Sequence, residues 1–248
     1  MMERSYQDYV DILNKNLPLV RERIRASQRE GREVTLLAAT KTVPVEVVNY
    51  AIRELGVTHI GENRVQELLE KYPLLHKDGV SIHFIGRLQT NKVKYIIDKV
   101  SLIHSVDSVK LAKEIDRQAA KHSLVMDILI EVNIGSEGSK GGILPDELDG
   151  FLEEIASFSH IRPMGLMVIP PADATKEETF DYFTRTYQFF VDFCEKKVHN
   201  SIDTYILSMG MSDSYEDAVS AGSNLVRIGS AIFGKRSYPT VVSEESEG

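Results

Sequence analysis

Apolar residues recur at every third or fourth position near the start of the chain. The positions are Tyr6, Val10, Leu13, Leu17, Val20 and Ile24. This spacing is the apolar stripe of an amphipathic helix, which we expect to end near Gly31. The next segment, residues 34–39, is almost wholly apolar and shows no polar alternation. A strand buried on both faces of a parallel sheet has this pattern.

The same succession of helix-like and strand-like segments continues along the chain. Pro44 suits the first position of the next helix and Gly56 suits its end, while Ser108 suits an N-cap. Further helices are expected at residues 44–55, 63–71, 92–100, 108–122, 145–157, 176–198 and 214–222. Buried strands are expected at residues 34–39, 57–61, 81–86, 102–106, 125–133, 161–169, 204–207 and 225–229.

Eight buried strands, each separated from the next by a helical segment, predict a single α/β domain. We expect a (β/α)8 barrel of the TIM type with an extra N-terminal helix, and the length of 248 residues suits one such barrel. An open, doubly wound sheet is the alternative, although it usually has about five or six strands. No change of composition marks a second domain. The barrel is therefore assigned to residues 1–236, and residues 237–248 are expected to be a disordered acidic tail.

The composition is that of an ordinary globular protein. Hydrophobic residues make up 42% of the chain and charged residues 27%, which excludes disorder of the whole chain. The first residues include Glu3, Arg4 and Asp8, where a signal peptide would be apolar. No apolar run reaches the ~20 residues that a membrane-spanning helix needs. We therefore expect a cytoplasmic protein with no membrane partner.

The charge and the cysteine count narrow the range of partners. The chain has 29 basic and 37 acidic residues and a net charge of −8, whereas nucleic-acid binding needs a clustered basic surface. The single cysteine, Cys194, is expected to pack in the core, and the seven histidines show no metal-binding spacing. Neither nucleic acid nor a metal is expected, which leaves an enzyme or a small-molecule binder.

In barrel enzymes the loops after the carboxyl ends of the strands carry the chemistry. The loop after the first strand places Lys41 beyond an otherwise apolar segment. If Lys41 is desolvated there, its pKa falls and its neutral amine becomes available to a carbonyl carbon. An ordinary solvated loop lysine is the alternative.

The loops after the last two strands are rich in glycine and serine. Barrels often bind phosphate at this place, because backbone N–H groups and a helix dipole both favour an anion. Ordinary turn residues are the alternative. The residues concerned are Ser208, Gly210, Ser212, Gly229 and Ser230.

Arg227 interrupts the apolar last strand, and a guanidinium inside a barrel needs an acceptor. That acceptor is either an internal carboxylate or a bound ligand. Closure of a barrel makes the first and eighth strands neighbours, so Lys41 is expected beside the phosphate loop. Three histidines fall in predicted strands and are expected to be packed or hydrogen-bonded there: His59, His83 and His104.

Five motifs, in one order, carry a resemblance over residues 37–234. They are ATKT (39–42), HIGENRVQE (59–67), HFIGRLQTNK (83–92), SMGMSD (208–213) and VRIGSAIFG (226–234). Together they resemble the pyridoxal phosphate homeostasis protein family. The resemblance implies a barrel similar to the N-terminal domain of alanine racemase, which binds pyridoxal 5′-phosphate (PLP) as a Schiff base.

The resemblance also implies roles for individual residues. Lys41 matches the lysine that forms the Schiff base, Arg227 matches the residue that faces the pyridine nitrogen, and Asn63 lies on a loop that lines the pocket. One departure is Arg87, where many members have proline. The phosphate is expected at Ser208, Gly210, Met211, Gly229 and Ser230.

An arginine keeps its proton, so a pyridine nitrogen opposite it stays unprotonated and the ring is a weak electron sink. The resemblance therefore implies a protein that buffers or delivers PLP to PLP-dependent apoenzymes, rather than an enzyme.

The chain ends soon after the eighth strand, so we expect no second, racemase-type domain, and we expect a monomer. The alternatives are a PLP-dependent amino-acid racemase and a Schiff-base aldolase acting on a sugar phosphate. A nucleic-acid or protein-binding module has little support.

Overall fold

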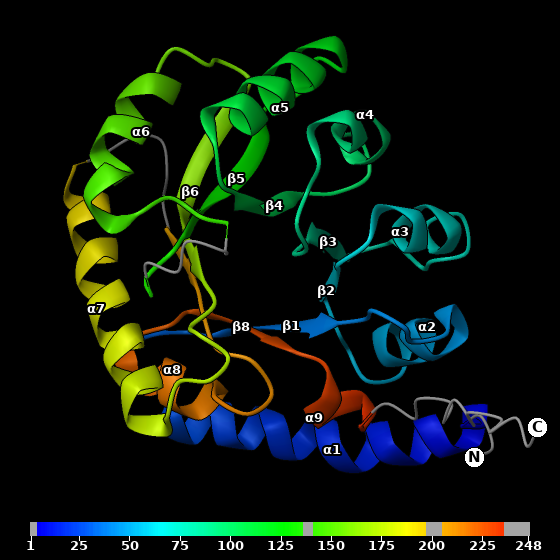
Figure 1. Ribbon diagram of the computed structural model, residues 1–248. Coiled ribbons are helices and arrows are strands. Elements are labelled where there is room, and N and C mark those ends of the chain that lie inside the picture. Colours follow the sequence, from blue (N-terminus) through cyan, green and yellow to red (C-terminus); the bar gives the residue numbers. More distant parts are fainter. Residues whose placement is uncertain (1–3, 136–140, 197–204, 236–248) are drawn as a thin grey trace, which may run out of the picture.

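Eight parallel strands close into a barrel in the order of the sequence. The computed structural model describes residues 4–135, 141–196 and 205–235. The first and last strands pair, with Thr35 opposite Leu225 and Ala38 opposite Ile228, and this closure excludes an open, doubly wound sheet. The strands, seen in Figure 1, are β1 (Thr35–Ala39), β2 (His59–Glu62), β3 (Ser81–Phe84), β4 (Leu102–Val106), β5 (Met126–Val132), β6 (Ile161–Val168), β7 (Ile206–Ser208) and β8 (Leu225–Ile228).

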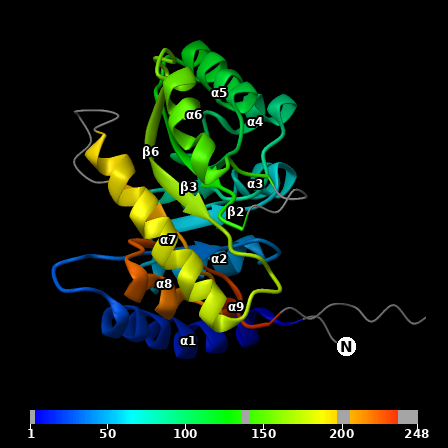
Figure 2. The same cartoon turned by 60° about the vertical axis from the view of Figure 1, so that its left-hand side comes forward.

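Helices surround the barrel, and one long helix, α1 (Tyr6–Ser27), precedes it. Ser5 and Asp8 form a reciprocal capping box at its start. The helix runs along one side of the barrel beside the C-terminal helices (Figures 1 and 2). The other helices are α2 (Val45–Arg53), α3 (Val65–Lys71), α4 (Val93–Ile96), α5 (Val109–Lys121), α6 (Leu148–Ile155), α7 (Lys176–Glu195), α8 (Tyr215–Ala221) and α9 (Ser230–Phe233), with the 3-10 turns η1 (Thr90–Lys92) and η2 (Pro145–Glu147).

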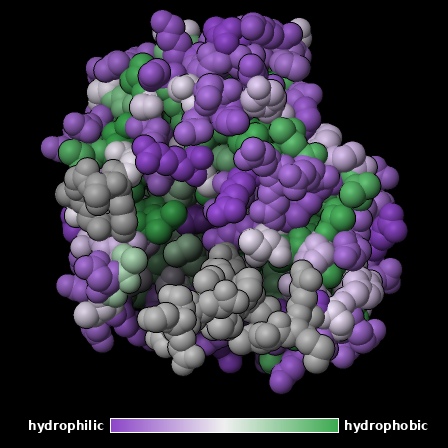
Figure 3. Space-filling view, turned by 45° about the vertical axis from the view of Figure 1, so that its right-hand side comes forward, coloured by the Kyte–Doolittle hydropathy of each residue, from purple (hydrophilic) through white to green (hydrophobic). Residues whose placement is uncertain are grey.

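Alternate side chains of each strand face either the helices or the barrel interior. The outward side chains, such as Ile60 and Ile103, belong to one large apolar core shared with the helices. The inward ones form two small apolar clusters, and buried polar side chains lie among them: His83, His104, Ser208 and Arg227. Charged and polar side chains dominate the outer face seen in Figure 3, as amphipathic helices require.

The predicted barrel with its extra N-terminal helix is confirmed, and each expected strand is present within a few residues of its predicted bounds. Ser108 is the N-cap of α5, and its hydroxyl accepts from the Leu111 N–H. Pro44 is extended and precedes α2 rather than opening it, so the predicted first residue was one position early. The helix predicted at residues 92–100 was too long, because only Val93–Ile96 is α-helical.

The helix α9 was not predicted from the sequence. It has four residues, which is too short to show an apolar period. The end of the helix predicted to reach residue 198, the start of the strand predicted from residue 204 and the acidic tail at 237–248 lie outside the described residues. In the described part of the chain no helix is long and apolar enough to span a membrane.

Candidate functional site

A cavity of about 570 Å³ opens at the carboxyl ends of the strands, where β1, β2 and β8 meet. Six of the expected site residues line it: Lys41, Asn63, Met211, Arg227, Gly229 and Ser230. Ser208 and Gly210 lie behind this wall, where they support the residues that reach the cavity. Ser212, which the sequence placed in the glycine- and serine-rich loops, also lines the cavity, together with four residues that the sequence did not single out: Arg4, Tyr9, Asp213 and Phe233.

Lys41 is held in a tight turn that follows β1. Val43 N–H donates to the Thr40 carbonyl at 3.0 Å, which closes the turn around Lys41 and Thr42. Thr42 has φ +63°, a left-handed conformation that usually requires glycine. Lys41 itself is half-buried. Its burial is thus intermediate between the two alternatives from the sequence, a solvated loop lysine and a fully desolvated one.

The loop after β7 and the start of α9 bring several hydrogen-bond donors together. The N–H groups of Gly229 and Ala231 both donate to the Ser212 hydroxyl, at 3.3 and 3.2 Å. Gly229 also lies against β1, since a Cβ there would sit 3.2 Å from the Ala39 carbonyl oxygen. Because the Ser212 hydroxyl accepts from both N–H groups, its own proton is left to donate to a bound anion.

Gly210 has a structural role that explains why only glycine suits this position. It has φ +92°, and a Cβ there would lie 2.5 Å from the Ala218 Cβ. Its carbonyl accepts from the Arg227 N–H at 3.1 Å. Gly210 therefore lets the loop after β7 pack closely on α8 while it fixes the end of β8.

Arg227 is fully enclosed, and oxygens of two neighbouring strands hold it. Its Nη1 donates to the Ser208 carbonyl at 2.9 Å and to the Ser208 hydroxyl at 2.6 Å, and its Nη2 donates to the Val168 carbonyl at 3.0 Å. Burial lowers the pKa of Arg227 to about 10, and the nearby Glu131 carboxylate opposes this shift. Arg227 thus stays charged at neutral pH. Among the described residues it makes no ion pair at bonding distance, and its edge remains part of the cavity wall.

A file of hydrogen bonds continues from Arg227 into the barrel. The Ser208 hydroxyl lies 3.1 Å from His104 Nδ1, and His104 Nε2 lies 2.9 Å from His83 Nδ1. Every proton of this series finds an acceptor when the Ser208 hydroxyl donates to His104 Nδ1 and His104 Nε2 donates to His83, and we assign the tautomers on that ground. Burial lowers the pKa of His83 to about 3 and holds the pKa of His104 well below its ordinary value. Both imidazoles are therefore neutral.

Asn63 gives the cavity wall a buried acceptor. Among the described residues, its Oδ1 has no hydrogen-bond partner. The loop after β3 packs against the Asn63 backbone at Gly86, where a Cβ would lie 2.0 Å from the Asn63 carbonyl oxygen. An enclosed amide in the wall of a cavity is the kind of group that a bound molecule would satisfy.

Other candidate chemistries find less support in the described residues. No group of three or more His, Cys, Asp or Glu side chains in the described part of the chain is arranged to hold a metal ion. Cys194 packs against the apolar core, and burial raises the pKa of its thiol to about 11, which disfavours the thiolate.

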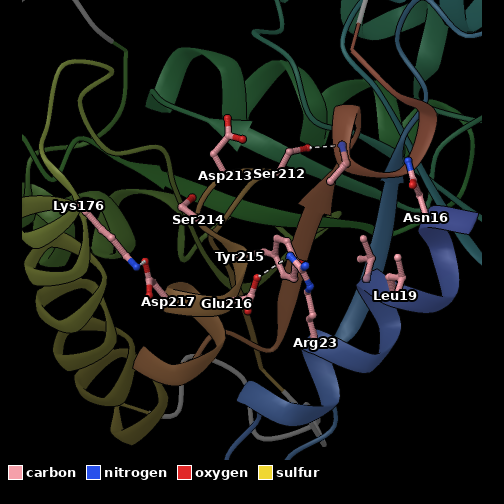
Figure 4. Close-up of a pocket in the computed structure, with 12 residues that line it drawn as sticks. Asn16, Leu19, Arg23, Lys176, Ser212, Asp213, Ser214, Tyr215, Glu216 and Asp217 are labelled. Atoms are coloured by element: carbon pink, nitrogen blue, oxygen red, sulfur yellow. Dashed lines mark hydrogen bonds and ion pairs between the residues drawn. The ribbon is translucent and has the colours of Figure 1, made fainter. Parts of the chain in front are cut away.

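A second cavity of about 440 Å³ lies on the other side of the Ser212 loop, between α1 and α8. Figure 4 shows Arg23 turned toward Glu216 and Lys176 turned toward Asp217, while Asp213 lies apart from them. Arg23 pairs with Glu216 at 3.5 Å, and Lys176 pairs with Asp217 at 3.6 Å. Since these charges satisfy each other, the cavity has less to offer a charged ligand than the one at Lys41.

The fold and the cavity together define a barrel of the alanine racemase class. A family model described as "Alanine racemase, N-terminal domain" matches residues 13–237. The pyridoxal phosphate homeostasis protein of Aquifex aeolicus (strain VF5) is 43% identical over 228 residues, which cover 90% of this chain and 98% of the relative. That of Escherichia coli (strain K12) is 38% identical and covers 90% and 96%. The chain belongs to the pyridoxal phosphate homeostasis protein family.

Solved structures agree with this assignment. PipY of Synechococcus elongatus PCC7942 without PLP has a TM-score of 0.79 at 30% identity, covering 90% of this chain and 100% of PipY. PipY with PLP bound has a TM-score of 0.76 at 29% identity and the same coverage. Alanine racemase of Clostridium difficile 630 has a TM-score of 0.66 at 18% identity, covering 91% of this chain and 58% of the racemase, which is a likeness of fold alone.

Proposed function

We propose that this chain binds PLP in the cavity at Lys41, holds it as a Schiff base and acts in PLP homeostasis. The observation that carries the proposal is the meeting of Lys41, the enclosed Arg227 and the N–H groups around Ser212 in one cavity. PLP presents an aldehyde, a ring nitrogen and a phosphate, so its three polar ends match these three kinds of group.

Lys41 is the residue proposed to form the covalent bond. Its amine nitrogen adds to the aldehyde carbon, and the aldehyde oxygen leaves with the two amine protons as water. The turn that follows β1 brings Lys41 to the cavity wall beside the end of β8, and the pairing of β1 with β8 fixes this placement. Asn63, next along the wall, supplies a buried amide oxygen on the same side.

The phosphate is assigned to the loop after β7 and the start of α9. Met211, Gly229 and Ser230 would line its site, while Ser208 and Gly210 would hold the loop and Arg227 from behind. The N–H groups that converge on Ser212 add a residue to this set. An anion there would accept from the Ser212 hydroxyl, which the two N–H groups hold in place.

Arg227 supports storage of the cofactor rather than turnover. Its guanidinium stays protonated at neutral pH and carries only N–H donors, so a ring nitrogen that faces it would accept a hydrogen bond and carry no proton. PLP supplies carbanion stabilisation to enzymes, and a ring nitrogen without a proton makes it a weak electron sink. The chain would therefore hold PLP without catalysing ordinary amino-acid chemistry.

The names of the relatives support a role in homeostasis, and a PLP-bound structure of PipY supports binding of the cofactor. We infer that the chain buffers PLP or delivers it to PLP-dependent apoenzymes, as a monomer in the cytoplasm. A racemase remains the rival function, since the fold is shared with alanine racemase. Racemisation of alanine by the purified chain at ordinary enzymatic rates would contradict the proposal.

The test is an absorption spectrum of the purified chain with added PLP, alongside Lys41→Ala and the control Lys113→Ala, which removes an exposed lysine on α5. We expect the wild type and the control to show a visible Schiff-base band that borohydride abolishes. Lys41→Ala should show only free PLP. Mass spectrometry after reduction should find the adduct on Lys41, and a wild type that takes up no PLP would overturn the proposal.

A further inference from the structure

The motif at residues 59–67 places only Asn63 in the cavity wall, yet it also carries the buried Glu62 and the half-buried Glu67. Glu62 and Glu67 meet Lys71 of α3 in the space between the barrel and the helix. Together with Thr40 they form the Lys71 cluster, which comprises Lys71, Glu62, Glu67 and Thr40. No part of the proposed cofactor chemistry uses this cluster.

Lys71 is a buried cation with every donor in use. Its Nζ lies 2.8 Å from Glu62 Oε1, 2.6 Å from Glu67 Oε1 and 2.8 Å from the Thr40 carbonyl oxygen. Lys71 is 9% exposed and Glu62 is 1% exposed. An ammonium group has three N–H donors, so these acceptors satisfy it completely. Because an enclosed cation is costly unless paired, the cluster has one favoured arrangement.

The cluster holds both peptide groups that flank Lys41. The Thr40 carbonyl, which accepts from Lys71, belongs to the peptide group before Lys41. The Thr42 N–H belongs to the peptide group after Lys41, and it donates to Glu67 Oε1 at 2.5 Å. The Thr40 hydroxyl is fixed as well, since it donates to Glu62 Oε1 at 2.6 Å.

The turn needs this support because its backbone is strained. Thr42 is a β-branched residue at φ +63°, in a position that normally takes glycine. Strained backbone persists only where surrounding contacts determine it. If the contacts to Glu67 and Lys71 were lost, Thr42 would relax toward negative φ, and the Lys41 side chain would swing with the peptide groups beside it.

We propose that Lys71 is a positioning residue for Lys41: by bridging Glu62, Glu67 and the Thr40 carbonyl, it keeps the Lys41 amine aimed into the cavity. The inference rests on the proposed role of Lys41. It assigns a role to the two carboxylates of the 59–67 motif, which lie outside the cavity.

The test compares Lys71→Met with the wild type, using the rate at which cofactor-free chain forms the borohydride-reducible adduct with added PLP. We expect the rate to fall about tenfold or more, because a small displacement of a reacting group lowers the reaction rate by about one to two orders of magnitude. Two controls are matched to it. Lys113→Met removes an exposed lysine, and Leu152→Ala destabilises the distant α6 without touching the turn.

Further variants keep the proposal open to contradiction if Lys71→Met folds poorly. The double variant Lys71→Met/Glu62→Leu removes the buried charge pair together, and Glu67→Ala removes only the acceptor of the Thr42 N–H. Both should slow adduct formation, with Glu67→Ala the milder. A measurement without cofactor is amide hydrogen exchange at Thr42, which should become faster in all three variants and stay unchanged in the controls.

The outcomes separate the two proposals. A wild type that forms no adduct at Lys41 overturns the proposed function. A wild type that forms it, with Lys71 and Glu67 variants that fold and react at the wild-type rate, overturns the positioning role alone. A loss of rate equal to that in Leu152→Ala would also overturn it, because lost stability would then explain the effect.

Discussion

Two polar clusters are buried in this barrel, and they differ in how they carry charge. The Lys71 cluster lies between the barrel and α3 and is ionic, with one ammonium group between two carboxylates. The file inside the barrel has one cation, Arg227, and then a hydroxyl and two neutral imidazoles. One cluster flanks Lys41 and the other holds Arg227, so each supports one side of the same cavity.

The two clusters show two ways in which a fold can bury polar groups. In the Lys71 cluster, opposite charges offset each other's desolvation, and removal of one partner leaves a stranded charge. In the interior file no second charge among the described residues lies at bonding distance, so the imidazoles stay neutral and are linked by hydrogen bonds alone. The stability of the first arrangement depends on the presence of every partner, and the stability of the second depends on pH.

The largest effect should come from removing one partner of the ionic cluster. Lys71→Met leaves Glu62 buried without a cation, so the free energy of unfolding should fall by about 3–5 kcal/mol in urea denaturation at pH 7. Burial already raises the pKa of Glu62, so part of this loss should return as the pH is lowered and Glu62 takes up a proton. The double variant Lys71→Met/Glu62→Leu should recover most of the stability. A double variant as unstable as the single one would show that Glu62 is not the stranded group.

The second-largest effect should come from lowering the pH, which destabilises the interior file. The folded-state pKa values of His83 and His104 lie below the unfolded value near 6.5, so the unfolded chain binds more protons below that pH. Stability is therefore full above about pH 6.5 and falls as the pH drops, by about 1.4 kcal/mol per pH unit for each histidine. Urea denaturation between pH 7 and pH 5 measures this slope. His104→Gln should flatten it by about half, and an unchanged slope would mean that other groups cause the loss.

A smaller effect is expected where the file meets Arg227. Ser208→Ala removes the hydroxyl that accepts from Arg227 and donates to His104, so the free energy of unfolding should fall by about 1–3 kcal/mol. The Schiff-base band should persist with a shifted maximum, because Arg227 keeps its other acceptors but loses one restraint. Ser220→Ala, which removes an exposed hydroxyl on α8, serves as the control for the spectrum. An unshifted band in Ser208→Ala would show that the hydrogen bonds of the file do not influence the bound cofactor.

Much of the site could be predicted because its signals are local. Lys41 follows an apolar strand directly, and Arg227 interrupts one, so each stands out against its neighbours in the sequence. The partners of these residues could not be predicted in the same way. His104 and Ser208 are 104 residues apart, and Lys71 meets Thr40 across 31 residues, with no pattern that links them. Tyr9 reaches the cavity from α1 and Arg4 from the residues just before that helix, which no spacing indicated.

The sequence by itself determined the order of strands and helices, because apolar runs and apolar stripes are set by neighbouring residues. Through them it also determined the barrel and the end of it that carries Lys41 and Arg227. Only the tertiary structure decided which buried groups stay charged. The charge state depends on which side chains the closed barrel and its helices bring within hydrogen-bond distance. Desolvation then favours charged groups that are paired, as around Lys71, and neutral groups where no pairing charge is near, as at His83 and His104.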